Sequence, residues 1–283
     1  MAERVPAGAF GRRPPSGSGG QHYASRVSPA ALTGAEVERF IEEGAVRLSA
    51  AFSPALAREC RELLWAATGC TPGDPSTWSQ PVVRIGGRAD PPFVAAANTE
   101  RLHGAFDQLA GPGRWVARRG LGTFPIRFPV GGDPGDAGWH IESTGTDAAG
   151  EVVVDPASLE RVLLMLFLFS DVGPHDAPTR VRLGSHRVAA RLLFPVGKPV
   201  GFLHAARVLD PLTENLVEAA ATGEAGDVWL CHPFVVHAAQ RNRGRSVRFL
   251  AQPPLGGTEP IDPGRPARDR SPVEEAVARA LSA

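Results

Sequence analysis

Short apolar runs separated by turn-forming residues fill the second half of the chain and restrict what it can fold into. Glycine, proline, aspartate and asparagine interrupt these runs, and the chain has 32 glycines and 27 prolines. Many short strands with turns between them favour a sandwich or jelly roll over alternating strand and helix units. The expected strands are residues 115–128, 152–154, 162–169, 180–183, 228–230, 234–237 and 247–251.

Helix signals flank and interrupt this β-rich region. Thr33-x-x-Glu36 is a capping box, and the apolar spacing that follows predicts a helix ending at Gly44. Ser53-Pro54 opens a second helix, because proline suits the first helical position. Further helices are expected at residues 98–109, 185–193, 213–221 and from 271 onward, with a short strand at 45–48.

The domain organisation follows from where hydrophobic residues begin. Residues 1–27 are too polar and glycine-rich to bury apolar area, which predicts a flexible N-terminal tail. The remaining chain, 28–283, is expected to form a single domain, since 43% hydrophobic content is enough for one large core. Its expected parts are a helical region over 28–112, a β core over about 113–255, and a C-terminal tail and helix over 256–283.

Charge and composition disfavour several classes of partner. Thirty basic and 30 acidic residues give a net charge of zero, so no long-range field attracts nucleic acid or an anionic membrane surface. The longest apolar run, 162–169, is far shorter than the ~20 residues of a membrane span, and the N-terminus lacks a signal-peptide pattern. We expect a cytoplasmic protein that binds a small molecule, with neither nucleic acid nor membrane as partner; its oligomeric state is left open.

The segment Gly138-Trp139-His140-Ile141-Glu142 carries the first candidate ligands. On a strand, His140 and Glu142 point to the same face while Ile141 points away. An imidazole and a carboxylate side by side can hold a metal ion. A structural His–Glu pair explains the same pattern, so this segment alone leaves both interpretations open.

A second segment, residues 226–249, combines a Gly-Asp turn, two histidines and an arginine. His232 and His237 are five residues apart, so on a regular strand they face opposite sides and only one of them can meet His140. Two imidazoles and one carboxylate form a facial triad that leaves positions open on iron(II). Arg248 can hold a carboxylate in bidentate fashion, because the guanidinium fork matches its geometry.

Together these motifs resemble the phytanoyl-CoA dioxygenase family of iron(II) and 2-oxoglutarate-dependent oxygenases. The resemblance rests on the H-x-E segment at 140–142, the Gly-Asp turn at 226–227, and His237 with Arg248 eleven residues later. The Leu-Gly-Ser-His stretch at 183–186 is similar to a P-G-S-H stretch of the family. The resemblance covers about half of the chain and implies a double-stranded β-helix (jelly-roll, cupin-like) core.

The resemblance also implies a site for each cofactor. Iron(II) would bind His140, Glu142 and His237, which are therefore the candidate catalytic and metal residues. Arg248 would hold the distal carboxylate of 2-oxoglutarate, and dioxygen would take the last position on the metal. This assignment selects His237 over His232, which then becomes a packing residue.

One departure from the family concerns the carboxylate. Glu142 stands where the family usually has aspartate, so its side chain is one methylene longer. Asp136 and Asp147 are the alternative carboxylates if Glu142 is turned away.

Several neighbouring residues have two possible roles. Thr123 and Arg127 could line the same cavity, although a strand-forming Thr and an outward-facing Arg are the simpler interpretations. Arg180 and Arg182 could contact an anionic substrate, or lie on a solvated sheet face.

The expected function is an oxygenase that hydroxylates, desaturates or cyclises a small organic substrate in bacterial secondary metabolism. One alternative is another cupin-type metal enzyme, an isomerase or hydrolase, although such an enzyme has no need for a dicarboxylate-binding Arg248. The other is a non-catalytic jelly-roll binding module. The substrate itself carries no recognisable motif in the sequence, because one scaffold serves many chemistries.

Overall fold

The computed structural model describes residues 30–283, so the tail predicted at 1–27 lies outside the described residues. The helices are α1 (Gly34–Glu43), α2 (Pro54–Thr68), α3 (Pro91–Ala97), α4 (Glu100–Ala110), α5 (Ser185–Leu193), α6 (Phe202–Thr213) and α7 (Pro272–Ser282). The strands are β1 (Ala45–Leu48), β2 (Val82–Ile85), β3 (Phe124–Arg127), β4 (Gly145–Thr146), β5 (Val152–Val154), β6 (Leu163–Leu168), β7 (Arg180–Arg182), β8 (Val200–Gly201), β9 (Glu218–Ala220), β10 (Val228–Cys231), β11 (His237–Ala238), β12 (Leu250–Ala251) and β13 (Pro254–Leu255).

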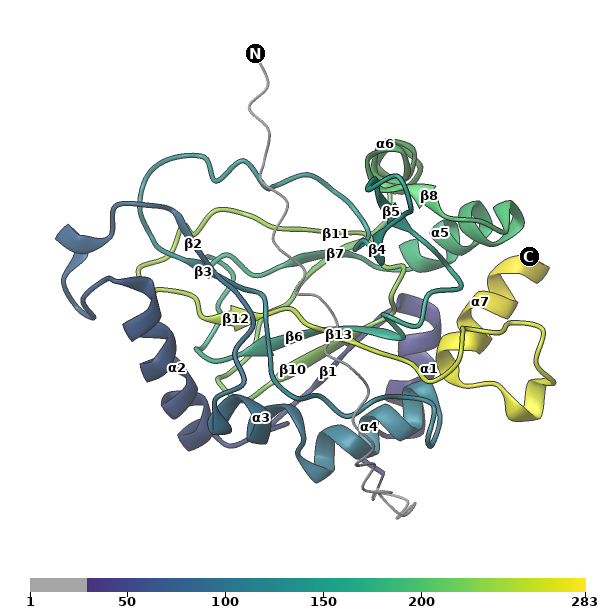
Figure 1. Ribbon diagram of the computed structural model, residues 1–283, viewed down its shortest axis with the longest axis horizontal. Coiled ribbons are helices and arrows are strands. Elements are labelled where there is room, and N and C mark those ends of the chain that lie inside the picture. The colour runs from purple at the N-terminus through teal and green to yellow at the C-terminus, as the bar shows by residue number, and fades with distance from the viewer. Residues whose placement is uncertain (1–29) are drawn as a thin grey trace.

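These strands form small sheets in a mixed helix and sheet protein. The largest has the order β1-β10-β6-β12, with β13 also paired to β6. The others have the orders β11-β7-β9, β2-β3 and β4-β5-β8, and the paired strands run antiparallel. Figure 1 shows α2, α3 and α4 along one side of the largest sheet, with β7 and β11 on the other. Both faces of that sheet are therefore covered.

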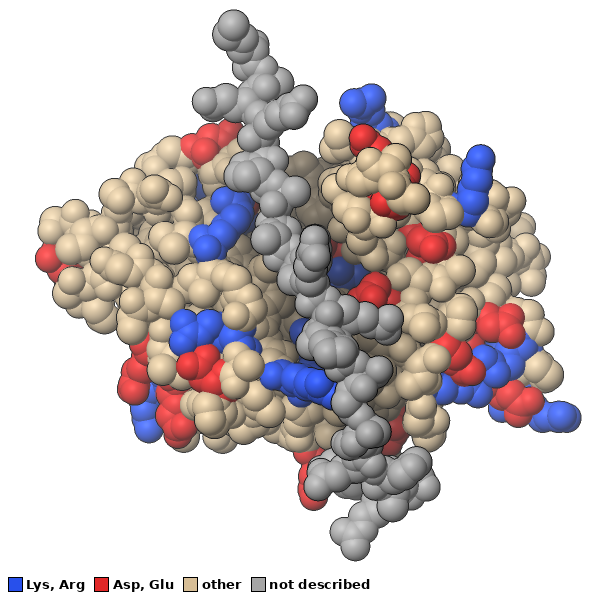
Figure 2. Space-filling view, in the orientation of Figure 1, with Lys and Arg blue, Asp and Glu red and all other residues tan. Residues whose placement is uncertain are grey.

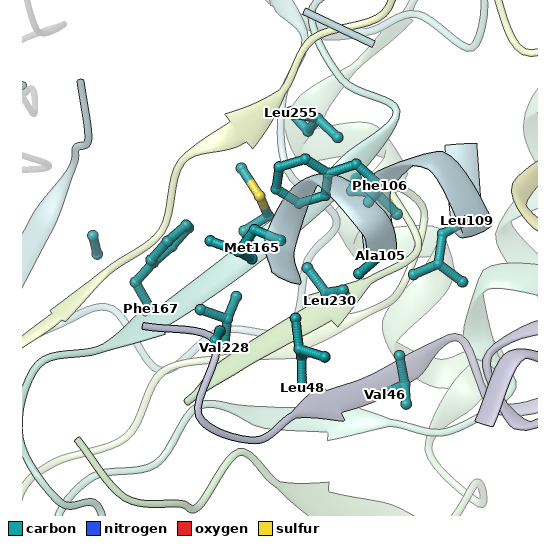
Figure 3. Close-up of a cluster of buried hydrophobic side chains, with 14 of the residues drawn as sticks. Val46, Leu48, Ala105, Phe106, Leu109, Met165, Phe167, Val228, Leu230 and Leu255 are labelled. Atoms are coloured by element: carbon teal, nitrogen blue, oxygen red, sulfur yellow. The ribbon is translucent and has the colours of Figure 1, made fainter. Parts of the chain in front are cut away.

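Strand β6 lies at the centre of the core because it is apolar on both faces. Met165 and Phe167 belong to the hydrophobic cluster that includes Phe106 of α4, whereas Leu164 and Leu166 pack in a second cluster toward β7. Figure 3 shows apolar side chains of three neighbouring strands gathered near α4; those labelled are Val46, Leu48, Met165, Phe167, Val228 and Leu230. A continuous apolar run is what a strand buried on both sides requires.

The helix ends follow local chemistry and agree with the predicted ones. The Thr33 hydroxyl accepts from Glu36 N while the Glu36 carboxylate accepts from Thr33 N, which completes the capping box. Gly44 then ends α1 with a left-handed φ of 82°, a conformation that glycine adopts without strain. The Ser53 hydroxyl caps α2 by accepting from Leu56 N, without a reciprocal side-chain bond. The sequence predictions for both helices are therefore confirmed.

Other predicted elements are wrong or displaced. The helix expected at 213–221 is absent: α6 ends at Thr213, and residues 218–220 form strand β9 against β7. This stretch is apolar enough for a helix or a strand, and pairing with β7 determines that it forms a strand. Of the strand expected at 115–128 only β3 forms, and of that at 234–237 only the last residue pairs. None of the helices in residues 30–283 is long and apolar enough to cross a membrane.

Two buried histidines join the helices to the core. His186 Nε2 lies 3.0 Å from Ile41 O, and the ring of His232 lies 4.8 Å from that of His186. Phe234 N donates to His232 Nδ1 at 3.2 Å, so that nitrogen carries no proton and the ring is neutral. Burial lowers the pKa of His186 to about 4, and burial with the nearby His186 holds the pKa of His232 well below its ordinary value.

These histidines make the stability of the protein sensitive to acid. Both pKa values are depressed in the folded state, so the unfolded chain binds more protons once the pH falls below about 6.5. We expect the free energy of unfolding to fall between pH 6.5 and pH 4, by up to about 1.4 kcal/mol per pH unit for each ring. Urea denaturation at several pH values should show that the free energy of unfolding depends less steeply on pH in His232→Gln than in the parent. The substitution His204→Gln, at an exposed position, should leave this pH dependence unchanged.

Candidate metal centre

The structure brings His140, Glu142 and His237 together. Each offers one ligand atom, and these atoms all lie within 4.8 Å of one another. The backbones of His140 and His237 pair in an isolated antiparallel bridge, with N···O distances of 3.0 and 2.9 Å in the two directions. Their ring centroids are 4.6 Å apart. Within residues 30–283 this is the one cluster of three or more such side chains that could hold a metal ion.

Both histidines present the nitrogen that a metal needs. His140 Nδ1 lies 2.8 Å from Gly138 O, and His237 Nδ1 lies 3.1 Å from Val235 O. A carbonyl oxygen can only accept, so each Nδ1 carries the proton and donates it. In the neutral rings the Nε2 lone pairs are then free, as in histidines that bind metals through Nε2.

Glu142 completes the set with a negative charge. Burial alone would raise the Glu142 pKa, but the hydrogen bond with His237 and the charge of Arg161 outweigh it and bring the pKa to about 2. His237 Nε2 lies only 3.4 Å from Glu142 Oε1. The hydrogen bond between these two atoms requires a proton on His237 Nε2. When that proton is absent both atoms are acceptors, and a metal cation between them would take its place.

The donor set indicates which metals fit. Two neutral imidazoles and one carboxylate, with no thiolate among them, match the facial triad of non-heme iron(II) sites. Gln252 Nε2 donates to Glu142 Oε1 at 3.4 Å, and Arg161 Nη2 lies 4.0 Å from Glu142 Oε2. Sequence reasoning overlooked both of these supporting residues, because neither belongs to a motif.

The alternative ligands lie elsewhere. His232 is fully buried and its Nε2 lies 3.2 Å from Val273 O of α7, so it is not part of the cluster. Asp136 binds Arg127, and Asp147 accepts from backbone N–H groups of its own turn. The carboxylate that the structure places beside the two histidines is therefore that of Glu142.

A cavity of about 410 Å³ extends from the two histidines. Its lining consists of Arg84, Ile85, Gly86, Thr123, Pro125, Arg127, Asp136, His140, Thr179, His237, Ala239, Arg248 and Gln252. Two of the three predicted metal ligands, His140 and His237, and the predicted co-substrate residue Arg248 thus line one cavity. A chamber of this size suits a small organic ligand.

Arg248 is buried at the wall of this cavity. Its Nη1 donates to Ala177 O at 2.5 Å and its Nη2 to Pro125 O at 3.0 Å, while Nε has no partner among the described residues. Burial and the nearby charge of Arg127 lower the pKa of Arg248 to about 9. A bound anion would relieve both effects, because opposite charge favours the ionised form.

Arg127 is not the outward-facing residue that the sequence suggested. It is 1% exposed, lines the cavity together with Thr123, and pairs through its backbone with Arg248. Its Nη2 donates to Asp136 Oδ2 at 2.7 Å. All four residues of β3 are buried, so strand alternation gave no indication of where this side chain points.

Arg180 and Arg182 do not line the cavity. Their guanidinium carbons lie 4.5 and 4.0 Å from the ring centroid of Trp139, a cation–π arrangement. Arg182 also bonds Asp210 and Thr213 of α6. These contacts hold the residue directly before His140.

Comparison with known proteins gives a likeness of structure only. No protein-family model and no curated protein matches the chain. Among solved structures it is similar to the non-heme alpha ketoglutarate dependent carbocyclase SnoK from nogalamycin biosynthesis, at 17% identity and a TM-score of 0.56, covering 85% of this chain and 93% of that one.

Two further solved structures are comparable. HygX from Streptomyces hygroscopicus, with nickel and 2-oxoglutarate bound, has 18% identity and a TM-score of 0.52 over 81% of this chain and 88% of its own. EctD from S. alaskensis, with 2-oxoglutarate and 5-hydroxyectoine, has 17% identity and a TM-score of 0.52 over 84% of this chain and 80% of its own. The chain has the fold that these proteins share.

The choice between the two histidines can be tested directly. His237→Ala removes a ligand atom and should weaken nickel(II) binding by at least about 100-fold. His232→Ala should leave nickel affinity near that of the parent while lowering the free energy of unfolding by about 2–4 kcal/mol, because it opens a buried space and breaks hydrogen bonds. Titration calorimetry and urea denaturation measure the two quantities, and the reverse pattern would show that the ligand is His232.

Proposed function

We propose that this protein is an iron(II) and 2-oxoglutarate-dependent oxygenase with a jelly-roll core, similar to the phytanoyl-CoA dioxygenase family, formed as one domain over residues 28–283. One observation carries the proposal: a single cavity holds the His140 and His237 pair and a buried guanidinium, Arg248, whose Nε is without a partner in the described chain. A metal ion would bind the histidine pair, and a dicarboxylate bound to that metal would reach the guanidinium with its far carboxylate.

The residues of the site have distinct roles in this proposal. His140, Glu142 and His237 hold the iron, and Arg248 pairs with the distal carboxylate of 2-oxoglutarate. Iron, 2-oxoglutarate and dioxygen bound there would supply the oxidation of a C–H bond, in which dioxygen is the oxidant: one of its oxygen atoms goes to succinate, formed from 2-oxoglutarate with release of carbon dioxide, and the other to the substrate or to water. The protein contributes orientation of the substrate and restricts the access of water to the reacting atoms.

The guanidinium favours this function over the other metal enzymes. An isomerase or hydrolase on the same three ligands needs no dicarboxylate, whereas a guanidinium buried like that of Arg248 is costly without an anion. Two of the similar structures, HygX and EctD, have 2-oxoglutarate bound. A binding module without chemistry is disfavoured by the three possible ligand atoms, two imidazole nitrogens and a carboxylate oxygen, gathered within 4.8 Å.

The reaction we propose returns oxygen or removes hydrogen: hydroxylation, desaturation or ring closure of a small molecule in bacterial secondary metabolism. Glu142 supplies the metal carboxylate, so that position is filled and not free for a halide. The similar structures include a carbocyclase from nogalamycin biosynthesis and an enzyme with 5-hydroxyectoine bound. They support the class of chemistry, while the substrate depends on the side chains of this cavity.

The role of Arg248 predicts a selective loss of co-substrate binding. Arg248→Gln should weaken 2-oxoglutarate binding to the nickel-loaded protein by at least about tenfold, or about 1.4 kcal/mol, while nickel affinity changes little. Arg248→Lys keeps the positive charge and should lose less 2-oxoglutarate affinity. This variant serves as the test if Arg248→Gln does not fold. Arg245→Gln, at an exposed position in the preceding turn, is the matched control. Equal effects at 245 and 248 would point to general electrostatics and contradict the assignment.

Turnover tests the class of reaction. With iron(II), 2-oxoglutarate and dioxygen, the parent should form succinate slowly even without substrate, and His140→Ala should reduce succinate to the level without protein. Mass spectrometry of succinate and an oxygen electrode measure the two sides of the reaction. A parent that binds zinc or manganese tightly but does not bind 2-oxoglutarate would favour the isomerase or hydrolase instead.

A further inference from the structure

Arg127 is a buried cation that the proposed co-substrate does not account for. It is 1% exposed, and its Nε and Nη1 atoms have no hydrogen-bond partner among residues 30–283. Only Nη2 is engaged, with Asp136 Oδ2 at 2.7 Å. Leaving two N–H nitrogens of a buried guanidinium unpaired is costly, so this arrangement indicates a ligand.

The charges around the cavity point to the sign of that ligand. Three guanidiniums, those of Arg84, Arg127 and Arg248, line the cavity, against one carboxylate, that of Asp136. Bound iron(II) adds two positive charges and Arg161, 4.0 Å from Glu142, adds one, while Glu142 and 2-oxoglutarate together add three negative ones. Two positive charges are left over. On the face drawn in Figure 2, by contrast, basic and acidic side chains are intermixed.

Arg127 and Arg248 line the same cavity but have different hydrogen-bond partners. The guanidinium of Arg248 donates to the carbonyl oxygens of Ala177 and Pro125, whereas the guanidinium of Arg127 has one hydrogen-bond partner among the described residues, Asp136. Asp136 also accepts from Arg84 Nη2 at 2.6 Å, and Arg84 is largely exposed at 58% of its side chain. This second group of charges therefore extends from the buried Arg127 toward solvent.

We propose that Arg127 binds an acidic group of the primary substrate, a carboxylate in the simplest case, at a subsite distinct from that of 2-oxoglutarate. Asp136 holds the guanidinium in place, and Arg84 extends the positive charge to the mouth of the cavity. The proposal rests on the proposed function, because the charge balance assumes bound iron and 2-oxoglutarate. It makes the substrate an organic acid and not a neutral molecule.

The test uses acetate as a minimal acid and acetamide as a neutral molecule of the same size. Both are titrated into the full-length protein loaded with nickel(II) and saturated with 2-oxoglutarate, at constant ionic strength, with the melting temperature as readout. Acetate should stabilise the parent and acetamide should not. Arg127→Gln should weaken the acetate effect at least tenfold, Arg127→Lys should retain part of it, and the exposed Arg58→Gln should behave as the parent.

The 2-oxoglutarate affinity of the same variants separates the two sites. We expect Arg127→Gln to bind 2-oxoglutarate within about threefold of the parent, unlike Arg248→Gln. If Arg127→Gln loses 2-oxoglutarate as strongly as Arg248→Gln, Arg127 belongs to the co-substrate site and the inference is wrong.

Three further outcomes are informative. If acetate stabilises Arg127→Gln as well as the parent, it binds to the nickel ion and not to Arg127. If acetate stabilises neither protein, the cavity has no subsite for an acid. Both outcomes overturn the inference while the proposed function stands. A parent that binds no 2-oxoglutarate overturns the proposed function itself. Should Arg127→Gln fail to fold, the double variant Arg127→Gln/Asp136→Asn removes both charges of the ion pair and is measured in its place.

Discussion

The antiparallel backbone bridge between His140 and His237 is the contact on which the site depends. It joins two segments far apart in the chain, and the centroids of the two imidazole rings lie 4.6 Å apart. A second bridge of the same kind joins Arg127 to Arg248. The two bridges thus bring two imidazoles and two guanidiniums to the wall of one cavity.

The charged groups inside this protein contribute little to its stability. Glu142 has Arg161 and Gln252 near it, and Arg127 has Asp136, yet several of the guanidinium nitrogens lack partners in the described chain. Burying ions in this way is at best neutral for folding. The apolar core around β6, covered on both faces, supplies the stability that lets the cavity keep unpaired charge.

Residues that contact no ligand still determine the geometry of the site. Trp139 lies against Arg180 and Arg182, and Arg182 is in turn bonded to α6. This stack restrains the backbone next to His140, which itself has no regular strand around it. A ligand on an irregular segment is precise only when its neighbours are fixed by packing and hydrogen bonds.

What the sequence determined by itself was local. The capping box at Thr33, the Ser-Pro start of α2, strand β1 and the H-x-E spacing all depend on residues within a few positions of one another, and short-range chemistry settles them. Tertiary structure decided the rest. Residues 218–220 became a strand because β7 offered a partner, and Arg127 turned inward because all of β3 is buried. His232 follows the end of β10 and lies against Val273 O of α7, whereas His237 begins β11 and pairs with His140. A turn separates the two histidines, so packing between distant segments, and not alternation along one strand, determines their neighbours.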